Sequence, residues 1–431
     1  MNKPSHRTRR PRGQEPDAPG VPARRAALKL LDAVLRRGLA LEQALDSAAQ
    51  GLAPNDRGLA HAIAGEALRR LPDLDALIDS ATQRDLPDDA KARFALRIAL
   101  VQALSLGTPG HAAISTVLPL VDGGPRKLVH GVFGTLLRQG ATLPEPPTLP
   151  DPVALRWHAA WGDQMIEDAE RAIAVPPPLD LTLRDPARVP DLSGRSLLPG
   201  HLRLDEKTSV TGIHGYAEGD WWVQDLAASM PARLIGKGSG TALDLCAAPG
   251  GKTLQLAAAG WQVTAVDVSE SRLARLHENL ERTGLSAEVV AADLLEWRPA
   301  GPVEAVLLDA PCSATGIFRR HPDVLHRVRP SLIVEMATLQ SRLLARAAGW
   351  VKPGGTLVFS TCSLEPQEGE AQLEGFLGNH PEFAIDPVIV DELPEGVSPR
   401  ADGTLRLLPG ALAEAGGLDG FFIARLRRAS R

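Results

Sequence analysis

Two of the three cysteines in this 431-residue chain stand in similar short loops, 50 residues apart. Cys312 lies in Pro311-Cys312-Ser313 and Cys362 lies in Thr361-Cys362-Ser363. Free cysteines usually pack as small apolar residues, but these two loops follow strand-like runs and are not placed for packing. A thiolate is a strong nucleophile, and its addition to carbon 6 of a pyrimidine makes carbon 5 nucleophilic. A base must later remove the proton from carbon 5, so two thiols and the carboxylate of Asp309 meet the needs of this chemistry.

The third cysteine, Cys246, opens a glycine turn of the kind that binds nucleotide-like ligands. The apolar run 242–246 ends in Pro249-Gly250-Gly251, and a helical pattern begins near Thr253. Glycines let the backbone approach a ligand closely, and the first turn of a helix presents free N–H groups. The segment falls one residue short of the phosphate loop G-x-x-x-x-G-K-[ST], because Cys246 stands where glycine is required. The turn alone does not decide between a phosphate loop and a binding site for another nucleotide-like ligand.

The elements that must position these residues alternate between strands and helices. We expect strands over 242–246, 262–267, 287–291, 303–308 and 356–360, with helices over 271–283 and 331–350. This alternation predicts a parallel sheet covered on both faces, with ligands at the carboxyl ends of its strands. Asp267, Asp293, Asp309 and Cys362 each follow such a run. Asp267 is placed to accept hydrogen bonds from a ribose diol, and Asp293 from an exocyclic amine.

The composition of the whole chain excludes several classes of protein. The chain is 44% hydrophobic and 23% charged, which is ordinary for a globular protein and sufficient for two to four domains. No run approaches the roughly 18 apolar residues of a membrane span. The basic, proline-rich start has no apolar core, so it is not a secretory signal, and three cysteines do not make a disulfide framework. We expect a cytoplasmic protein.

The chain divides into five stretches by composition and periodicity. We expect a disordered basic tail over 1–20, an all-helical domain over 21–141 and a proline-rich linker over 142–152, then a small α+β adaptor over 153–237 and an α/β domain over 238–431. Residues 1–140 hold 20 Lys and Arg against 14 Asp and Glu, a formal +6, which leaves −11 for the remainder. This charge asymmetry favours binding of RNA or DNA by the all-helical domain. The alternative is that its basic residues only form a solvated helical surface.

The helical domain resembles the NusB-like RNA-binding domain. The resemblance is carried by residues 23–31 (ARRAALKLL), 111–114 (HAAI) and 132–138 (VFGTLLR). It implies phosphate contacts by basic residues, among which Arg24 and Arg25 are the first candidates.

The α/β domain resembles the S-adenosylmethionine-dependent RNA cytosine-C5 methyltransferases. The residues that carry this resemblance are 244–252 (DLCAAPGGK), 309–313 (DAPCS) and 361–363 (TCS). Residues 319–323 (RRHPD), 419–422 (DGFF) and the NusB-like front resemble the RsmB (Sun/Fmu) branch. Membership of that branch implies a Rossmann-like fold, S-adenosylmethionine as methyl donor and a cytosine of small-subunit (16S) ribosomal RNA as substrate.

The resemblance also implies roles for single residues. Cys362 would be the nucleophile and Cys312 would assist product release, a choice that the residues alone leave open. Asp309 would hold the cytosine edge and protonate its ring, while Arg319 and Arg320 would steer RNA phosphates. The methyl donor would be lined by Cys246, Ala247, Ala248, Pro249, Gly250, Gly251, Lys252, Asp267, Asp293 and Asp309. No metal is implied, and a monomer suffices.

Three alternatives differ from this interpretation in different ways. A phosphate-loop NTPase lacks support because of the missing first glycine, the proline in the loop and the unexplained pair of thiols. A non-catalytic RNA-binding assembly factor would not need the thiols. A transfer-RNA methyltransferase of the same chemistry differs only in substrate, on which the motifs are silent. One departure from the family lies at Val324-Leu325-His326, where a Lys-Trp pair is usual, and it leaves RNA contacts there open.

Overall fold

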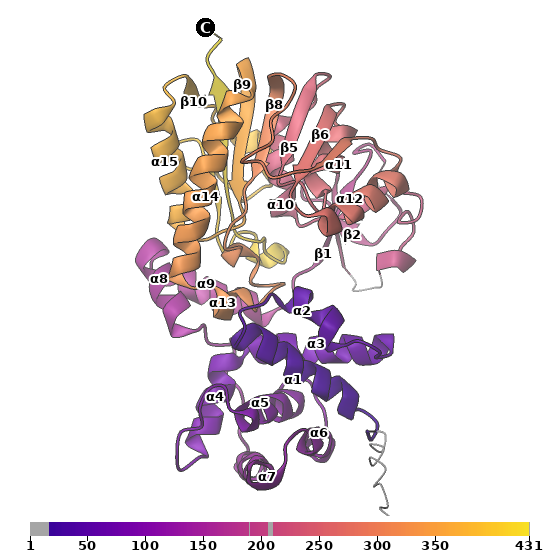
Figure 1. Cartoon of the computed structure of the whole chain (residues 1–431), viewed down its shortest axis with the longest axis vertical. Coiled ribbons are helices and arrows are strands. Elements are labelled where there is room, and N and C mark those ends of the chain that lie inside the picture. The colour runs from indigo at the N-terminus through magenta and orange to yellow at the C-terminus, as the bar shows by residue number, and fades with distance from the viewer. Residues whose placement is uncertain (1–16, 189, 206–209, 431) are drawn as a thin grey trace, which may run out of the picture. The chain divides into compact units, whose positions relative to one another are not determined.

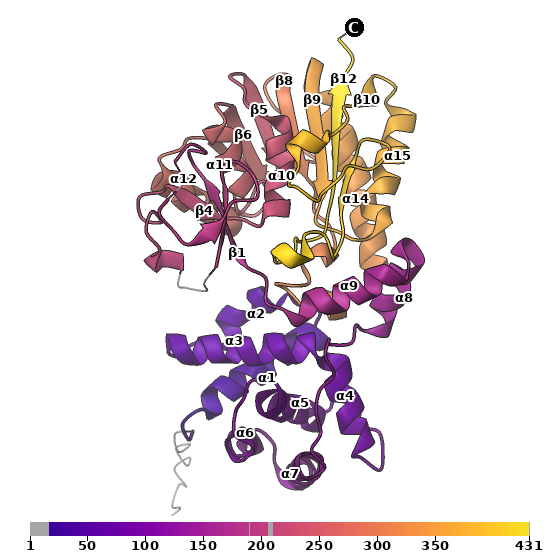
Figure 2. The same ribbon diagram turned by 180° about the vertical axis from the view of Figure 1, so that it is seen from behind.

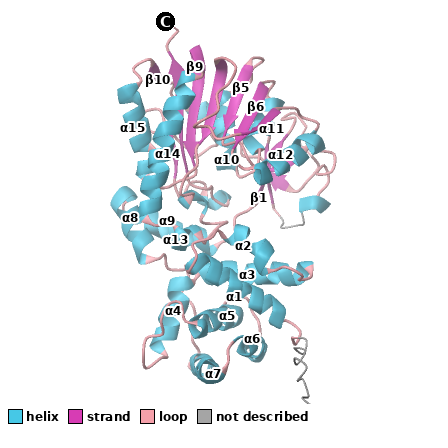
Figure 3. Cartoon of the chain, in the orientation of Figure 1, coloured by secondary structure: helices cyan, strands magenta, loops and turns pink. Residues whose placement is uncertain are grey.

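The computed structural model describes residues 17–188, 190–205 and 210–430 (Figure 1). These residues form two compact units, one up to Leu143 and one from Pro144 onward. Most of the tail that we expected to be disordered, residues 1–16, lies outside the described residues. Asp17, at its end, makes an ion pair with Arg25 at 2.8 Å. Among the described residues, strands occur only in the second unit (Figure 3).

Every secondary-structure element described in the first unit is a helix. Its α5 helix is buried along most of its length and packs against α1, α3, α4, α6 and α7. The helix bounds are α1 (Val21–Leu35), α2 (Leu41–Ala48), α3 (Pro54–Arg69), α4 (Leu71–Ser80), α5 (Lys91–Leu104), α6 (Gly110–Val117) and α7 (Gly123–Arg138). Alanine and leucine fill the core, which suits close helix–helix packing.

Part of the positive charge of this unit is neutralised inside it. Arg97 of α5 is almost fully buried and donates two hydrogen bonds to Asp75, at 2.7 and 2.8 Å. Arg93, equally buried, contacts Asp75 at 3.2 Å and Asp79 at 2.5 Å. Buried guanidinium groups require such partners, so these arginines stabilise the bundle and are not presented to a nucleic acid.

The second unit begins with two helices and a small antiparallel sheet. Its first elements are α8 (Asp151–Trp161), α9 (Asp163–Ala174), β1 (Leu179–Leu183), β2 (Gly194–Arg195), β3 (His201–Leu204) and β4 (Trp221–Val223), in the sheet order β2-β3-β1-β4. Trp157 of α8 packs against Phe318, with ring centroids 5.3 Å apart, in a core that also includes Leu364. The α+β segment therefore shares its core with the residues that follow it.

The large sheet has the order β10-β12-β9-β8-β5-β6-β7, with β11 paired to β12. Its elements are α10 (Leu226–Ile235), β5 (Thr241–Leu245), α11 (Gly251–Ala258), β6 (Gln262–Asp267), α12 (Glu270–Thr283), β7 (Glu288–Ala291), β8 (Val303–Asp309), α13 (Val324–Arg327), α14 (Pro330–Gly349), β9 (Val351–Thr361), α15 (Glu370–Asn379), β10 (Phe383–Ile385), β11 (Leu405–Leu407) and β12 (Phe421–Arg428). The expected Rossmann-like α/β fold, preceded in the chain by an all-helical region, is confirmed.

The five strands that the sequence predicts are parallel, and the sheet continues beyond them at one edge with antiparallel strands. Strands β5 to β9 run parallel, but β12 pairs antiparallel with β9, and β10 and β11 pair antiparallel with β12. A parallel neighbour needs a crossover, usually a helix, whereas a chain that returns directly gives an antiparallel pair. No α-helix lies between β10 and β12 among the described residues, so the last strand enters the sheet in the opposite direction.

Helices cover both faces of the large sheet. Helices α14 and α15 lie over one face, which Figure 1 shows in front, and α10 lies over the opposite face, seen in Figure 2. Strands β5 and β8 lie in the middle and are buried on both sides; Leu307 and Leu308, which point to opposite faces of the sheet, have no exposed surface. The burial fixes these strands rigidly, so the loops at their carboxyl ends start from defined positions.

We expect Leu308→Ala to lower the free energy of unfolding of this unit by about 2 to 5 kcal/mol, because it removes buried methyl groups and leaves a cavity. Leu155→Ala is the matched control, since Leu155 is 71% exposed. All seven tryptophans lie between residues 157 and 350, so their fluorescence reports this unit during urea denaturation. Equal shifts for the two variants would contradict the assignment of Leu308 to the central core.

Candidate active site

The carboxyl ends of β8 and β9 carry the residues expected to do chemistry. Asp309 is the last residue of β8 and lies opposite Ser360 of β9, whose hydroxyl donates to Asp309 Oδ1 at 2.7 Å. Lys252 Nζ donates to Asp309 Oδ2 at 2.7 Å. Burial lowers the pKa of Lys252, but the charge of Asp309 and this hydrogen bond outweigh burial and raise it, so the ammonium keeps its proton.

The two loop thiols meet, as their positions after neighbouring strands predict. Cys312 Sγ and Cys362 Sγ lie 3.5 Å apart, although the residues are 50 positions apart in the chain. The pKa of Cys312 is raised by its hydrogen bond with Cys362, by burial and by the negative charges around it. Cys312 therefore holds its proton at neutral pH while a negative charge lies nearby.

The glycine turn connects β5 to α11 at the same edge of the sheet. Cys246 and Gly250 both have positive φ angles, of 60° and 109°. Gly250 has no room for a side chain, because a Cβ there would lie 2.3 Å from Leu276 Cδ1. Burial raises the pKa of the Cys246 thiol well above its usual range, so this thiol is not a nucleophile at neutral pH.

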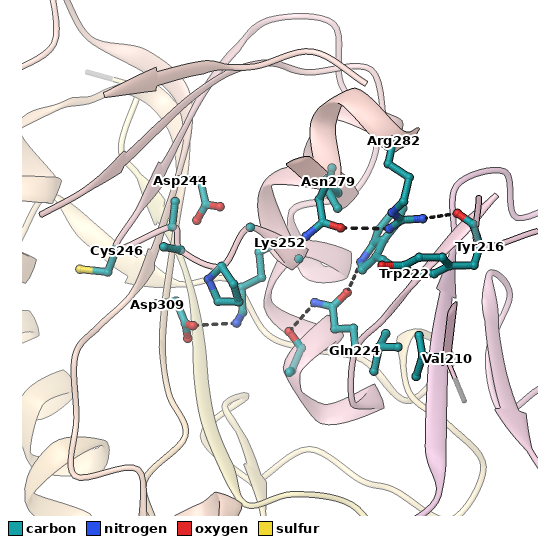
Figure 4. Close-up of a pocket in the computed structure, with 18 residues that line it drawn as sticks. Val210, Tyr216, Trp222, Gln224, Asp244, Cys246, Lys252, Asn279, Arg282 and Asp309 are labelled. Carbon is teal, nitrogen blue, oxygen red and sulfur yellow. Dashed lines mark hydrogen bonds and ion pairs between the residues drawn. The ribbon is translucent and has the colours of Figure 1, made fainter. Parts of the chain in front are cut away.

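A cavity of about 290 Å³ opens beside this turn, with Asp244, Lys252 and Asp309 in its wall (Figure 4). Asp244 is fully buried; one carboxylate oxygen accepts a hydrogen bond from Thr253 at 2.5 Å. Its other oxygen, Oδ1, has no hydrogen-bond partner among the described residues. Burial raises the pKa of Asp244 to about 7. A buried acceptor without a partner is costly, so this cavity fits a ligand with a positively charged donor.

The opposite wall of the cavity comes from residues that the sequence did not single out. Trp222 Nε1 donates to Gln224 Oε1 at 2.9 Å, and Arg282 donates to Asn279 at 3.0 Å (Figure 4). The guanidinium of Arg282 also lies 4.3 Å from the centre of the Tyr216 ring. Residues 216 to 224 belong to the small α+β segment, so that segment completes the cavity. The only signal in the sequence was a Trp-Trp-Val-Gln-Asp run before a helix.

Two of the expected ligand-binding carboxylates do not line this cavity. Asp267 is almost fully buried and accepts hydrogen bonds from the backbone N–H of Ala248 at 3.1 Å and of Ser269 at 2.9 Å. Asp293 is exposed and accepts the N–H of Leu295 at 2.8 Å. Asp267 thus supports the glycine turn, and Asp293 closes a turn after β7.

Arg319 and Arg320 do not occupy the exposed position that steering RNA phosphates requires. Arg319 is 4% exposed and donates to the carbonyl of Gly416 at 2.5 Å. Arg320 pairs with Asp225 at 3.0 Å and with Asp419 at 3.5 Å. The arginines join the 315–320 loop to the segment before β12, and the sequence did not reveal these acidic partners.

The two arginines expected to bind phosphate in the helical unit differ from each other. Arg24 is buried, and its Nε donates to Gln102 Oε1 at 2.8 Å, so the expectation of a phosphate contact is wrong for this residue in the folded bundle. Burial also lowers the pKa of Arg24. Arg25 lies one position further along α1 and is partly exposed, with Asp17 as its partner. Of these two arginines, Arg25 is the one whose side chain reaches the surface.

The described residues contain no group of His, Cys, Asp and Glu side chains arranged to hold a metal ion. None of the helices they form is long and apolar enough to cross a membrane.

The Rossmann-like sheet, its glycine turn and the thiol pair at its carboxyl edge define a group-transfer enzyme domain. Residues 233–427 match the family model of the 16S rRNA methyltransferase RsmB/F, and residues 21–133 match the NusB family. A ribosomal RNA small subunit methyltransferase B from Xanthomonas campestris pv. campestris is 34% identical over 96% of this chain and 99% of that protein. The Salmonella arizonae protein of the same name is 32% identical over 94% and 98%.

The chain belongs to the RsmB/F family of 16S rRNA methyltransferases. The resemblance found in the sequence, including the NusB-like front, is thereby confirmed. The crystal structure of PH0851 shares the fold, with a TM-score of 0.72 and 23% identity over 96% of this chain and 100% of that one.

The buried carboxylate in the cavity gives a prediction for pH. Asp244 has a folded pKa of about 7 against 3.8 for the ordinary group, so the folded protein binds this proton more tightly than the unfolded chain does. Stability without ligand therefore falls as pH rises from about 4 to 7. We expect Asp244→Asn to raise the free energy of unfolding at pH 8 by up to about 4 kcal/mol and to change it little at pH 4.

Urea denaturation followed by tryptophan fluorescence at both pH values measures this effect. Asp293→Asn, which removes an exposed carboxylate, is the control and should leave the pH dependence unchanged. The account of Asp244 is wrong if the Asn variant follows the wild-type pH dependence.

Proposed function

We propose that this protein transfers a methyl group from S-adenosylmethionine to carbon 5 of a cytosine in 16S ribosomal RNA, through a transient covalent bond between Cys362 and the pyrimidine. The observation that carries the proposal is the 3.5 Å separation of Cys312 Sγ and Cys362 Sγ in the loops after β8 and β9. Asp309, at the end of β8, also lines the cavity beside the glycine turn. Neither a phosphate loop nor a passive RNA-binding factor has a use for this pair. Family membership supports ribosomal over transfer RNA.

The cavity beside the glycine turn suits the methyl donor. S-adenosylmethionine carries an ammonium and a sulfonium group, and it supplies an electrophilic methyl group when bound. Asp244 Oδ1 is a buried acceptor suited to the ammonium, and Cys246 to Lys252 bring backbone groups to the cavity wall. Asp267 and Asp293 follow the neighbouring strands β6 and β7, where the adenosine part would extend.

Cys362 would open the reaction by adding its sulfur to carbon 6 of the cytosine. As the carbon–sulfur bond forms, the electron pair of the C5–C6 double bond moves into the C4–C5 bond and the C4–N3 π pair moves onto N3, which takes up a proton. Carbon 5 is then nucleophilic and would bond to the methyl group, while the electron pair of the broken methyl–sulfur bond stays on the donor's sulfur. Asp309 would hold the cytosine edge and relay the proton from solvent to the ring nitrogen, while Lys252 and Ser360 fix its carboxylate from two sides.

Cys312 would complete the reaction by acting on the methylated adduct. Release requires removal of the proton from carbon 5, after which the carbon–sulfur bond breaks and its electron pair returns to Cys362. The hydrogen bond and charge of Cys362 raise the pKa of Cys312 before the reaction. Once Cys362 is bound to carbon, its charge is gone and Cys312 loses its proton more readily. The pair thus separates the two roles in time.

The helical unit would bind RNA, as its family match and its basic residues suggest. Arg25 is an accessible candidate for phosphate contact, whereas Arg24, Arg319 and Arg320 are not retained in that role. We place the enzyme in the cytoplasm. A monomer suffices for the reaction, because each catalytic group proposed here belongs to one chain.

We expect Cys362→Ala to abolish both turnover and the covalent enzyme–RNA complex, because no nucleophile adds to carbon 6. Cys312→Ala should still add to RNA and methylate it once, but release it slowly, so a complex resistant to denaturation accumulates. Denaturing gels and transfer of labelled methyl groups to unmodified 16S ribosomal RNA measure both results. Leu155→Ala, which changes an exposed side chain outside the site, is the control, and the reverse behaviour of the two loop variants would contradict the assigned roles.

Deletion of residues 1–140 should weaken RNA binding and reduce its dependence on salt, because fewer phosphate contacts release fewer counterions. Affinity for S-adenosylmethionine should stay unchanged, since the cavity lies within residues 210–309. Fluorescence titration at several salt concentrations measures both. Unchanged RNA affinity would contradict the role proposed for the helical unit.

A further inference from the structure

Glu368 is a buried carboxylate that neither the sequence nor the mechanism above has used. It ends the short turn Pro366–Glu368 after β9 and has no exposed surface. Burial raises its pKa above the ordinary value, although hydrogen bonds from Ser313 and Ser363 oppose this effect. A buried carboxyl group persists where its surroundings supply donors, so its partners show what it does.

The partners of Glu368 come from both cysteine loops. The backbone N–H of Ser313 donates to Glu368 Oε1 at 2.8 Å, and the hydroxyls of Ser313 and Ser363 both donate to Oε2. The two hydroxyl oxygens lie 3.2 Å apart. Gln340 of α14 adds a longer contact to Oε1 at 3.4 Å and donates to the carbonyl of Pro311 at 2.8 Å. One carboxylate therefore connects the two loops.

Each serine directly follows one of the two thiols. The position of Ser313 fixes the backbone at Cys312, and the position of Ser363 fixes the backbone at Cys362. Backbone contacts run alongside, since the N–H of Gly316 donates to the carbonyl of Cys362 at 2.9 Å. That hydrogen bond fixes the position of one loop relative to the other, and the Glu368 bridge connects the residues that directly follow the two cysteines.

We propose that Glu368 is a positioning residue that holds Cys312 and Cys362 at reacting distance by bridging Ser313 and Ser363. The catalytic consequence rests on the proposed function; the geometric one does not. An ionised carboxylate only accepts hydrogen bonds and can take all of these donors at once. A glutamine in its place presents an NH₂ group, which cannot accept, so at least one serine donor loses its partner.

The first test measures the distance between the thiols without RNA or methyl donor. Diamide oxidises two neighbouring thiols to a disulfide, and peptide mapping by mass spectrometry identifies the Cys312–Cys362 product. We expect Glu368→Gln to form this disulfide at least about tenfold more slowly than the wild type, since small displacements have large effects on reactions between positioned groups. Glu374→Gln, which changes an exposed glutamate on α15, is the matched control and should react at the wild-type rate.

The second test measures the chemical step. We expect Glu368→Gln to lower kcat about 100-fold while KM for S-adenosylmethionine stays within about twofold, because the donor cavity does not include this residue. The double variant Ser313→Ala with Ser363→Ala should reproduce this split, and Glu368→Asp should recover part of the rate. Unfolding in urea, followed by tryptophan fluorescence, shows which variants are folded; if Glu368→Gln is not, the serine double variant gives the result.

The outcomes separate this proposal from the proposed function. Wild-type disulfide rates in folded Glu368→Gln or in the folded serine double variant would overturn the positioning role. A rise in KM for S-adenosylmethionine with unchanged kcat in folded Glu368→Gln would overturn it as well. Full methyl transfer by Cys362→Ala would instead refute the proposed function, and slower disulfide formation in the Glu368 variants would still support the bridge.

Discussion

The structure depends on the adjacency of β8 and β9 at the centre of a buried sheet. Because the two strands are parallel and paired, the loops that leave their carboxyl ends start side by side. This is what brings Cys312 and Cys362 to 3.5 Å and sets Asp309 next to Ser360. The helices on both faces contribute by keeping these strands fixed, and the glycine turn after β5 brings Lys252 to the same edge.

Several carboxyl groups lie around this edge, two of them fully buried, and each is used differently. Asp309 is paired with a lysine, Glu368 is surrounded by neutral donors, and Asp244 leaves one oxygen without a partner among the described residues. The first arrangement keeps a charge in place, the second holds two loops together, and the third leaves a place for a cationic ligand. The pKa of Asp419, raised to about 7 by burial, shows that the cost of burying acids extends to the segment before β12.

The sequence predicts the parts of this site that follow from periodicity. The strands that carry Asp267, Asp309 and Cys362 at their carboxyl ends could be located, because apolar runs and helical patterns alternate in the sequence. The proximity of the two thiols follows from the parallel pairing of their strands. The antiparallel β12 could not be foreseen, since its partner is chosen by the path of the preceding chain. The burial of Arg24 and Arg319 could not be predicted either. The sequence does not show whether an amide or carbonyl oxygen from a distant part of the chain accepts a hydrogen bond from an arginine.

The central claim is that the sulfur of Cys362 bonds to carbon 6 of a cytosine. Its most direct test uses the wild-type protein, S-adenosylmethionine and a 16S ribosomal RNA fragment made with 5-fluorocytidine, in which fluorine at carbon 5 blocks release. Mass spectrometry of the digested complex should find the methylated nucleotide attached to the peptide that contains Cys362. Attachment to the Cys312 peptide, or methylation with no attached nucleotide, would contradict the account.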